Sequence, residues 1–158
     1  MPQQLIEKDA CDLLDADHVA VKHLFVEYAR LAVAGDPAGE RQAYAQKICN
    51  ELTVHAQIEE EIFYPALREV IDAPELLDEA EAEHQEAKDM IAALEGMPAA
   101  DAGMDDLVAK LAAAIEHHVK EERTQLFPKA RSAKGLDLDA LGAQLKQRQQ
   151  ELEAEMAA

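Results

Sequence analysis

The chain has 158 residues and a formal net charge of -18, from 33 Asp and Glu residues against 15 Lys and Arg residues. This length fits one domain with its own core, and 49% hydrophobic with 30% charged residues is typical of soluble globular proteins rather than disordered or membrane-spanning ones. The acidic balance argues against nucleic acid and anionic membranes as partners, because both need a basic protein face. Cations are the expected partners by charge.

The N-terminal stretch MPQQLIEKDACDLL lacks the basic segment and apolar run of a secretory signal, and no segment of the chain reaches about 18 apolar residues. We therefore expect a cytoplasmic protein. Cys11 and Cys49 each lie where a helical face can bury them, and the chain has no CxxC pair. This pattern predicts two reduced core thiols, and neither a disulfide nor a thiolate metal site.

Four long segments follow in which apolar residues recur with the 3.6-residue period of an amphipathic helix. The stretches GDPAG, DAP and GMPAADAG, which contain most of the glycines and prolines, separate them. Beyond Lys134 and Gly135, spaced leucines predict a fifth, shorter helix, which we expect to cap the bundle. The predicted helices cover about residues 9–34, 40–71, 75–95, 105–131 and 137–156.

Short connections between long amphipathic helices favour antiparallel neighbours. We therefore predict an all-α fold, an antiparallel up-down-up-down four-helix bundle with a short fifth C-terminal helix. The four-helix core spans about residues 9–131 of a single domain that covers residues 1–158. Each of the four inward stripes contains one histidine, and these are His18, His55, His84 and His118.

The second and fourth helices contain the same motif, HAQIEEEIFYP at 55–65 and HVKEERTQLFP at 118–128. In both, a glutamate follows the histidine at the fourth position, and an aromatic residue and a proline follow at the ninth and tenth. The first and third helices contain DADH, which ends at His18, and EAEH, which ends at His84. The repeat predicts two equivalent hairpins that each supply half of one site.

Pro65 and Pro128 remove a backbone donor inside their predicted helices and should bend or end them. The aromatic residues that precede these prolines should pack around the end of the site and limit water entry; they are Phe63, Tyr64 and Phe127. All three tyrosines are interpreted as packing residues, with contact between one of them and the site as the alternative; they are Tyr28, Tyr44 and Tyr64.

Residues four apart lie on one helical face with Cβ atoms about 5–6 Å apart, so His55 with Glu59, and His118 with Glu122, can serve one metal centre. A buried ionised carboxylate is costly unless a cation compensates it, and no Lys or Arg lies on these inward stripes. Four histidines and two glutamates are too many for one tetrahedral zinc and suit two metal ions joined by bridging carboxylates. Nitrogen and oxygen ligation favours iron or manganese, with zinc and copper as alternatives, and iron is our first choice.

The predicted cofactor is a pair of iron ions with an oxo or hydroxo bridge, and the protein ligands leave a position for dioxygen, nitric oxide or peroxide. His23 and His117 point away from the inward stripes. An alternative register of the fourth helix would turn His117 and Glu121 inward in place of His118 and Glu122. Asp15 and Glu81 are interpreted as surface acids that can hydrogen-bond an imidazole or reach the metal. The predicted metal ligands are His18, His55, Glu59, His84, His118 and Glu122.

The motifs DH, HAQIE, EH and HVKEE, which contain the six predicted ligands, together resemble the hemerythrin-like, or HHE cation-binding, domain family over about residues 9–131. The family pattern is a histidine on the first helix, HxxxE on the second, a histidine on the third and HxxxE on the fourth. The resemblance implies a non-haem di-iron centre in an antiparallel bundle. It also implies that Glu59 and Glu122 are bridging carboxylates and that the four histidines are terminal ligands.

Oxygen-carrying hemerythrins have two histidines four residues apart on the third helix, where this chain has Ala80 before His84 and Lys88 after it. This departure argues against reversible oxygen carriage. The leading hypothesis is a cytoplasmic di-iron protein that binds or senses dioxygen, nitric oxide or peroxide. The alternatives are a catalase-like or peroxidase-like di-iron enzyme, and a metal-free bundle whose acidic face and fifth helix bind a protein partner. A ferritin-like oxidase is disfavoured, because EAEH supplies only one Glu-x-x-His.

Overall fold

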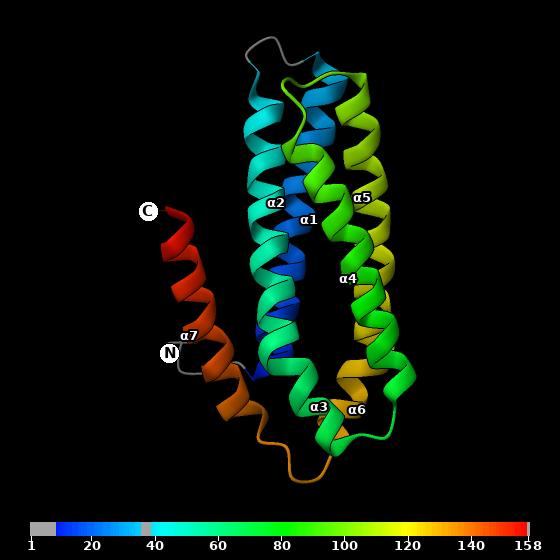
Figure 1. Ribbon diagram of the computed structural model, residues 1–158, viewed down its shortest axis with the longest axis vertical. Coiled ribbons are helices and arrows are strands. Elements are labelled where there is room, and N and C mark those ends of the chain that lie inside the picture. Colours follow the sequence, from blue (N-terminus) through cyan, green and yellow to red (C-terminus); the bar gives the residue numbers. More distant parts are fainter. Residues whose placement is uncertain (1–8, 36–38, 158) are drawn as a thin grey trace, which may run out of the picture.

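The computed structural model describes residues 9–35 and 39–157, which form helices and no strand. Four long helices run antiparallel along the longest axis, and a further helix follows at the C-terminus (Figure 1). The predicted all-α bundle with a fifth helix is therefore confirmed. The elements are α1 (Ala10–Ala34), α2 (Glu40–Ile58), the π-helical turn η2 (Glu59–Phe63), α3 (Tyr64–Val70), α4 (Pro74–Glu95), α5 (Ala102–Glu121), the π-helical turn η3 (Glu122–Leu126), α6 (Phe127–Ser132) and α7 (Leu138–Ala157).

Local signals set the helix ends. Asp9 and Asp12 form a reciprocal capping box at the start of α1, in which each side chain accepts a backbone N–H of the other residue. Gly35 ends α1 with φ 87°, a left-handed conformation that glycine adopts without steric cost. Asp101 caps α5, which begins at Ala102, three residues before the predicted start. The N-terminal residues 1–8 and residues 36–38 of the GDPAG stretch lie outside the described residues.

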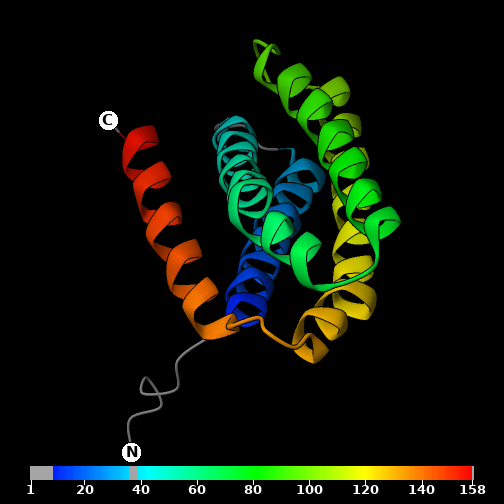
Figure 2. The same cartoon turned by 60° about the horizontal axis from the view of Figure 1, so that its bottom comes forward.

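The helices pack as two hairpins and one flanking helix (Figure 2). The α1–α2 hairpin lies in the middle, with the α4–α5 hairpin on one side and α7 on the other. α7 contacts α1, α2 and η2, and its Leu141, Leu145 and Leu152 are buried. The expectation that this helix caps the bundle is wrong, because its leucine face covers the flank of α1 and α2 instead.

Of the two predicted effects of the prolines, bending or ending a helix, the structure excludes the ending. The chain continues helically past Pro65 to Val70 and past Pro128 to Ser132, and a π-helical turn precedes each proline. At the end of η2 the backbone N–H of Tyr64 donates to the carbonyl of Glu59, five residues back. At the end of η3 the N–H of Phe127 donates to the carbonyl of Glu122 in the same way. The wider turn shifts the hydrogen-bond pattern at the point where proline offers no donor.

Two apolar clusters fill the bundle, and a polar layer separates them. One cluster joins the start of α1 to α3, α6 and α7, and the other joins the remaining lengths of α1, α2, α4 and α5. His18 lies in the chain between Leu14 of the first cluster and Val21 of the second. Both cysteines are free and buried, one in each cluster, as the sequence predicts.

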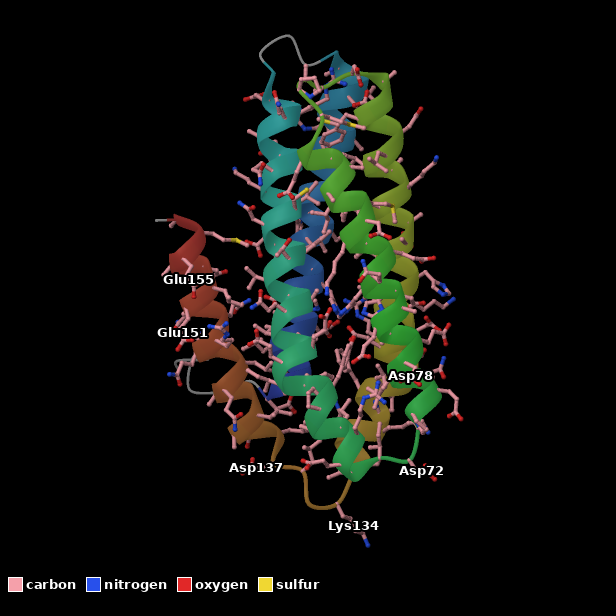
Figure 3. All side chains as sticks on the ribbon, in the orientation of Figure 1. Asp72, Asp78, Lys134, Asp137, Glu151 and Glu155 are labelled. Atoms are coloured by element: carbon pink, nitrogen blue, oxygen red, sulfur yellow. The ribbon has the colours of Figure 1, made fainter. Side chains whose placement is uncertain are left out.

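Much of the acidic charge lies on the outside of the bundle. Glu151 and Glu155 lie on α7, while Asp72, in the connection before α4, and Asp78, in the first turns of α4, lie on the opposite side of the molecule (Figure 3). The side chains of Asp78 and Glu155 are each 70% exposed. Within the described residues, no helix combines the length and the apolar character that a membrane crossing requires.

Candidate metal centre

The polar layer brings together all six residues that the sequence singles out. Glu59 and Glu122 are 0% exposed, and the four histidines are 5–7% exposed. Their ligand atoms fall into two groups, and within each group all atoms lie within 4.8 Å of one another. The first group is His18, His55, Glu59 and Glu122, and the second is Glu59, His84 and His118.

In the first group, the α1–α2 hairpin supplies both imidazoles. His18 Nε2 lies 3.0 Å from Glu122 Oε1, and His55 Nε2 lies 3.3 Å from Glu59 Oε1. The two rings are 4.8 Å apart between centroids. We call this set, with Glu122 completing it from the other hairpin, the first half of the site.

In the second group, the α4–α5 hairpin supplies both imidazoles, which lie 4.8 Å apart between ring centroids. His84 Nε2 lies 3.0 Å from Glu59 Oε1 and 3.2 Å from His118 Nε2. His118 Nε2 also lies 3.6 Å from Glu122 Oε2. This second half therefore repeats the first, and the two carboxylates lie between the histidine pairs.

Tyr64 also enters the site, although the sequence predicts a packing role for it. Its hydroxyl donates to Glu122 Oε2 at 2.7 Å and lies 3.3 Å from Glu59 Oε1. It also lies 3.3 Å from Nε2 of both His84 and His118, so it adds an oxygen to the second half. Burial and the two carboxylates raise the pKa of Tyr64 well above its ordinary value, so the phenol keeps its proton in the absence of a metal ion.

The π-helical turn explains why Tyr64 faces the site. In a regular α-helix, a residue five positions after Glu59 is rotated about 140° from it and cannot share its face. In η2 the backbone N–H of Tyr64 donates to the carbonyl of Glu59, so one full turn contains the extra residue and the tyrosine returns to the inward face. No periodicity argument that assumes 3.6 residues per turn can find this residue.

Each of the four histidines also presents its Nδ1 to a carboxylate. These contacts fix the ring orientation, and in the neutral imidazole they place the proton on Nδ1 and leave the Nε2 lone pair for a metal ion. The contacts are His18 with Asp15 at 3.2 Å, His55 with Asp17 at 3.2 Å, His84 with Glu60 at 2.7 Å and His118 with Glu83 at 2.7 Å.

Two of these carboxylates explain the acidic residue that precedes the histidine in the repeated DH and EH motifs. Asp17 does not contact its neighbour His18 but reaches across to His55 on α2. Glu83 likewise reaches His118 on α5. In each hairpin, the first helix thus supplies one imidazole and orients the imidazole of the second, a role that the sequence analysis missed.

A further layer of donors holds three of the four carboxylates. Arg123 Nε lies 2.5 Å from Asp15, and Lys88 Nζ lies 2.7 Å from Glu60. Gln149 of α7 donates to both oxygens of Asp17, at 3.0 and 2.9 Å. The C-terminal helix therefore reaches the first half of the site through Asp17.

The donor set fits metal ions. Four buried atoms that face the interior of the layer have no hydrogen-bond partner among the described residues, and they are His18 Nε2, His55 Nε2, Glu59 Oε2 and Glu122 Oε1. His18 Nε2 and Glu122 Oε1 are 3.0 Å apart, yet their directions do not meet hydrogen-bond geometry. Lone pairs that converge on a common point, with no donor between them, match the arrangement of metal ligands.

The electrostatics of the layer require positive charge. Burial raises the pKa of Glu59, but His55 and hydrogen bonds from neighbouring groups hold it well below its ordinary value. Burial lowers the pKa of His55, whereas Glu59 and Asp17 raise it to about 10. Burial also lowers the pKa of His118, but Glu122 and Glu59 raise it to about 12. Without metal ions, protons on the histidines therefore balance the two buried carboxylates.

The other residues that the sequence singles out lie outside the layer. His23 is exposed, and the side chain of His117 is 65% exposed beside Glu83 and Glu121, so the alternative register is wrong. Glu81 pairs with Arg68 on the surface at 3.4 Å. The two other tyrosines are packing residues, as predicted: Tyr28 donates to Asp105, and Tyr44 lies beneath Lys47.

Comparisons with known proteins agree with this site. The family model of the hemerythrin HHE cation binding domain matches residues 9–130. A DNA nickase of Nostoc sp. (strain PCC 7120) is 32% identical over 124 residues, which are 77% of this chain and 33% of that protein, so the chain spans about a third of that relative. A crystal structure of a hemerythrin HHE cation binding domain-containing protein from Mycobacterium kansasii has a TM-score of 0.79 and 27% identity, covering 94% of this chain and 89% of that chain.

A helical bundle with a buried layer of histidines and glutamates defines a metal-binding protein. The chain belongs to the hemerythrin HHE cation-binding domain family, because the family model covers most of its length. The resemblance found in its motifs is therefore confirmed. α7 lies outside the residues that the family model matches, although Gln149 reaches the site.

Proposed function

We propose that this protein holds two iron ions in the polar layer, one at each histidine pair, and binds or senses dioxygen, nitric oxide or peroxide there. Glu59 and Glu122 would hold both ions as shared carboxylates, and the four histidines would each hold one ion. The observation that carries this proposal is the gathering of histidine nitrogens and carboxylate oxygens into two buried groups, the first of which includes the residues of all four layer atoms without a hydrogen-bond partner among the described residues. Iron is favoured by the mixed nitrogen and oxygen donors, which include no thiolate.

A cavity of about 480 Å³ supports the proposed access of a small ligand. It lies between α2 and α4, reaches all four histidines, and has apolar walls that include Leu52, Ala87 and Ile91. Uncharged molecules such as dioxygen, nitric oxide and hydrogen peroxide can enter such a path with little desolvation cost. We call it the ligand cavity.

The chain's own residues have separate roles in this proposal. Bound iron supplies redox chemistry and Lewis acidity. The Tyr64 hydroxyl, 2.7 Å from Glu122 Oε2, would hydrogen-bond this carboxylate or an incoming ligand. Asp15, Asp17 and Glu83 orient imidazoles through Nδ1, and the apolar cluster on each side of the layer excludes bulk water.

The test is anaerobic loading of purified protein with ferrous iron, followed by elemental analysis and an optical spectrum after oxidation. We expect about two irons per chain and ligand-to-iron charge-transfer absorption, with spectral changes on addition of nitric oxide or peroxide. Adjacent histidines provide a matched pair: His118→Ala should lose iron, whereas His117→Ala should retain it. A chain that takes up no iron would favour the metal-free interaction bundle instead.

A catalase-like activity is the second candidate, and Tyr64 favours it. The Tyr64 hydroxyl lies 3.3 Å from Nε2 of both histidines of the second half, where it could hydrogen-bond a peroxide, and the chain has Ala80 and Lys88, not a further histidine, four residues before and after His84. Two hydrogen peroxide molecules would yield one dioxygen and two waters, so no external reductant is needed. Oxygen release above that of the same concentration of free iron, reduced in Tyr64→Phe, would support it; equal rates would exclude it.

The nickase name of the Nostoc relative does not lead us to propose DNA cleavage for this chain. The match covers a third of that protein, and this chain carries a net charge of -18, which opposes binding to a phosphate backbone. We propose that nucleic acid is not a partner. Electrophoretic mobility of nicked and intact duplexes, unchanged by added protein at low salt, is the expected result.

A further inference from the structure

A second cavity, of about 500 Å³, lies between α1 and α5, across the bundle from the ligand cavity. We call it the α1–α5 groove. Its walls are mostly apolar and consist of Val21, Phe25, Val26 and Ala29 from α1 and Ala112, Ile115 and Val119 from α5. Its volume falls within the range of about 300–1,000 Å³ that is typical of sites for organic molecules, and far exceeds that of a diatomic gas.

The α1 side of this groove exposes large apolar side chains to solvent. Val26, in the groove, is 57% exposed. Val19 and Val33, each seven residues from Val26 on the same face of α1, are 46% and 91% exposed. The only other large apolar residue that is exposed within residues 9–35 and 39–157 is Met156. Exposed large apolar residues are therefore concentrated on the face of α1 that includes Val26, and Val26 itself lines the groove, as at sites that bind an apolar partner.

The charged residues of the groove are unusual for this acidic chain. Lys22, Lys120 and Arg123 line it together with a single carboxylate, that of Glu116. The ligand cavity, in contrast, contains four carboxylates and one lysine. Arg123 is paired with Asp15, whereas neither Lys22 nor Lys120 has an ion-pair partner among the described residues. Two unpaired cations beside an apolar channel fit an anionic head group joined to an apolar tail.

We propose that the α1–α5 groove binds an amphipathic organic anion, of the class of medium-chain alkyl carboxylates. The carboxylate lies between Lys22 and Lys120, and the alkyl chain lies against the apolar walls. The groove shares His18, Val21, Ile115 and Val119 with the ligand cavity, so the bound molecule lies beside the first half of the site. Binding itself needs no iron, because the head group and tail contacts come from residues outside the proposed ligand set.

The first experiment titrates decanoate and dodecanoate, below their micelle concentrations, into metal-free and iron-loaded full-length protein by calorimetry. We expect one molecule per chain in both forms and affinity that rises about fourfold per added CH₂ until the groove is filled, the equivalent of about 0.8 kcal/mol per CH₂. Decyltrimethylammonium, which has a similar tail and the opposite charge, should bind at least tenfold more weakly. Equal binding of the cation, or no saturable binding, would overturn the proposal.

The second experiment locates the head group and the tail. The double variant Lys22→Glu, Lys120→Glu should weaken decanoate binding at least tenfold, whereas Lys110→Glu, on an exposed residue of the same helix as Lys120, should leave it within twofold. Ala112→Phe should block the tail. Equal losses in the double variant and Lys110→Glu, or full binding by Ala112→Phe, would overturn the assignment. Circular dichroism and melting temperature verify that each variant is folded.

The two proposals can fail separately. Decanoate that binds a chain unable to hold iron would leave the groove intact and overturn only the di-iron centre. Iron-loaded protein that binds no decanoate would overturn only the groove and leave the di-iron centre intact. Decanoate that also shifts the charge-transfer spectrum in the wild type, and not in the double lysine variant, would place the alkyl carboxylate next to His18 as the shared wall residues predict.

Discussion

The two halves of the site have the same frame and different chemistry. The histidine rings meet at 59° in the first half and 60° in the second, with the same 4.8 Å between centroids. In the first half Phe127 stacks on His18 at 6.1 Å and 12°, whereas in the second the Tyr64 hydroxyl contacts both imidazoles. These aromatic residues occupy the same position of the repeated motif, so one side-chain difference makes the two proposed metal positions inequivalent.

The largest effect should come from a carboxylate that both halves share. Glu59 belongs to both groups of ligand atoms, so Glu59→Ala should reduce iron from about two per chain to well under one. His84→Ala should cost only the iron of the second half. Elemental analysis of anaerobically loaded protein measures both, with Glu61→Ala, an acid on the exposed side of the same turn, as the control. Equal iron in Glu59→Ala and Glu61→Ala would contradict the shared role.

Replacement of either aromatic residue by its counterpart, so that both halves carry the same ring, should remove the difference between the halves. Tyr64→Phe leaves Glu122 without its 2.7 Å donor, and we expect the metal-free protein to lose about 1–3 kcal/mol of unfolding free energy. The iron-loaded variant should keep its iron but change its absorption spectrum. Urea denaturation and optical spectroscopy provide the measurements. Phe127→Tyr is the reciprocal change, and an identical spectrum for both variants and the wild type would show that neither ring affects the metal.

The pH dependence should separate metal-free from iron-loaded protein. Folding raises the pKa of His55 to about 10 and of His118 to about 12 from an ordinary value of 6.5, so their protonation stabilises the metal-free fold fully below about pH 6.5. This stability is lost as the pH rises through the folded-state values. Glu59, with its lowered pKa, contributes stability above its ordinary value of 4.5 and loses it in acid.

Melting temperatures at pH 6 and pH 9 test this expectation. Chelator-treated protein should have a lower melting temperature at pH 9 than at pH 6, whereas the melting temperature of iron-loaded protein should not fall. Iron replaces the histidine protons and binds more tightly as they are lost. A melting temperature of the chelated protein that is unchanged or higher at pH 9 would contradict proton occupancy of the site.

The smallest effect should come from α7, and only in the first half. Gln149 contacts Asp17, which orients His55, so Gln149→Ala should weaken iron binding less than the roughly 10–100-fold typical of residues that contact a ligand directly. The loss should be confined to one of the two irons. Competition with a chelator measures it, and Gln150→Ala, an exposed neighbour, is the control. Equal weakening of both irons would show a general effect on stability instead.

The sequence predicts the bundle and the placement of six polar residues in one buried layer, because both depend on the regular 3.6-residue period; that these six bind metal stays a prediction. It gives contact between a tyrosine and the site only as an alternative and does not single out Tyr64, because a π-helical turn changes that period for one turn before Pro65. It also misses the roles of Asp17 and Glu83, which depend on how closely neighbouring helices pack. The position of α7 could not be predicted, because its leucines fit a flank as well as an end. The cytoplasmic location and the single domain over residues 1–158 stay predictions.

The polar layer between two apolar clusters has a consequence for how this molecule unfolds. Both clusters include residues of α1, α2 and α4, but they are separated at the level of the proposed metal site, where attraction between cations and carboxylates would replace apolar packing. Bound iron would then link the two ends of the bundle, so that they unfold in one cooperative transition. A chelated chain, held there only by protons, would release the end near α3 and α6 and the opposite end in separate transitions.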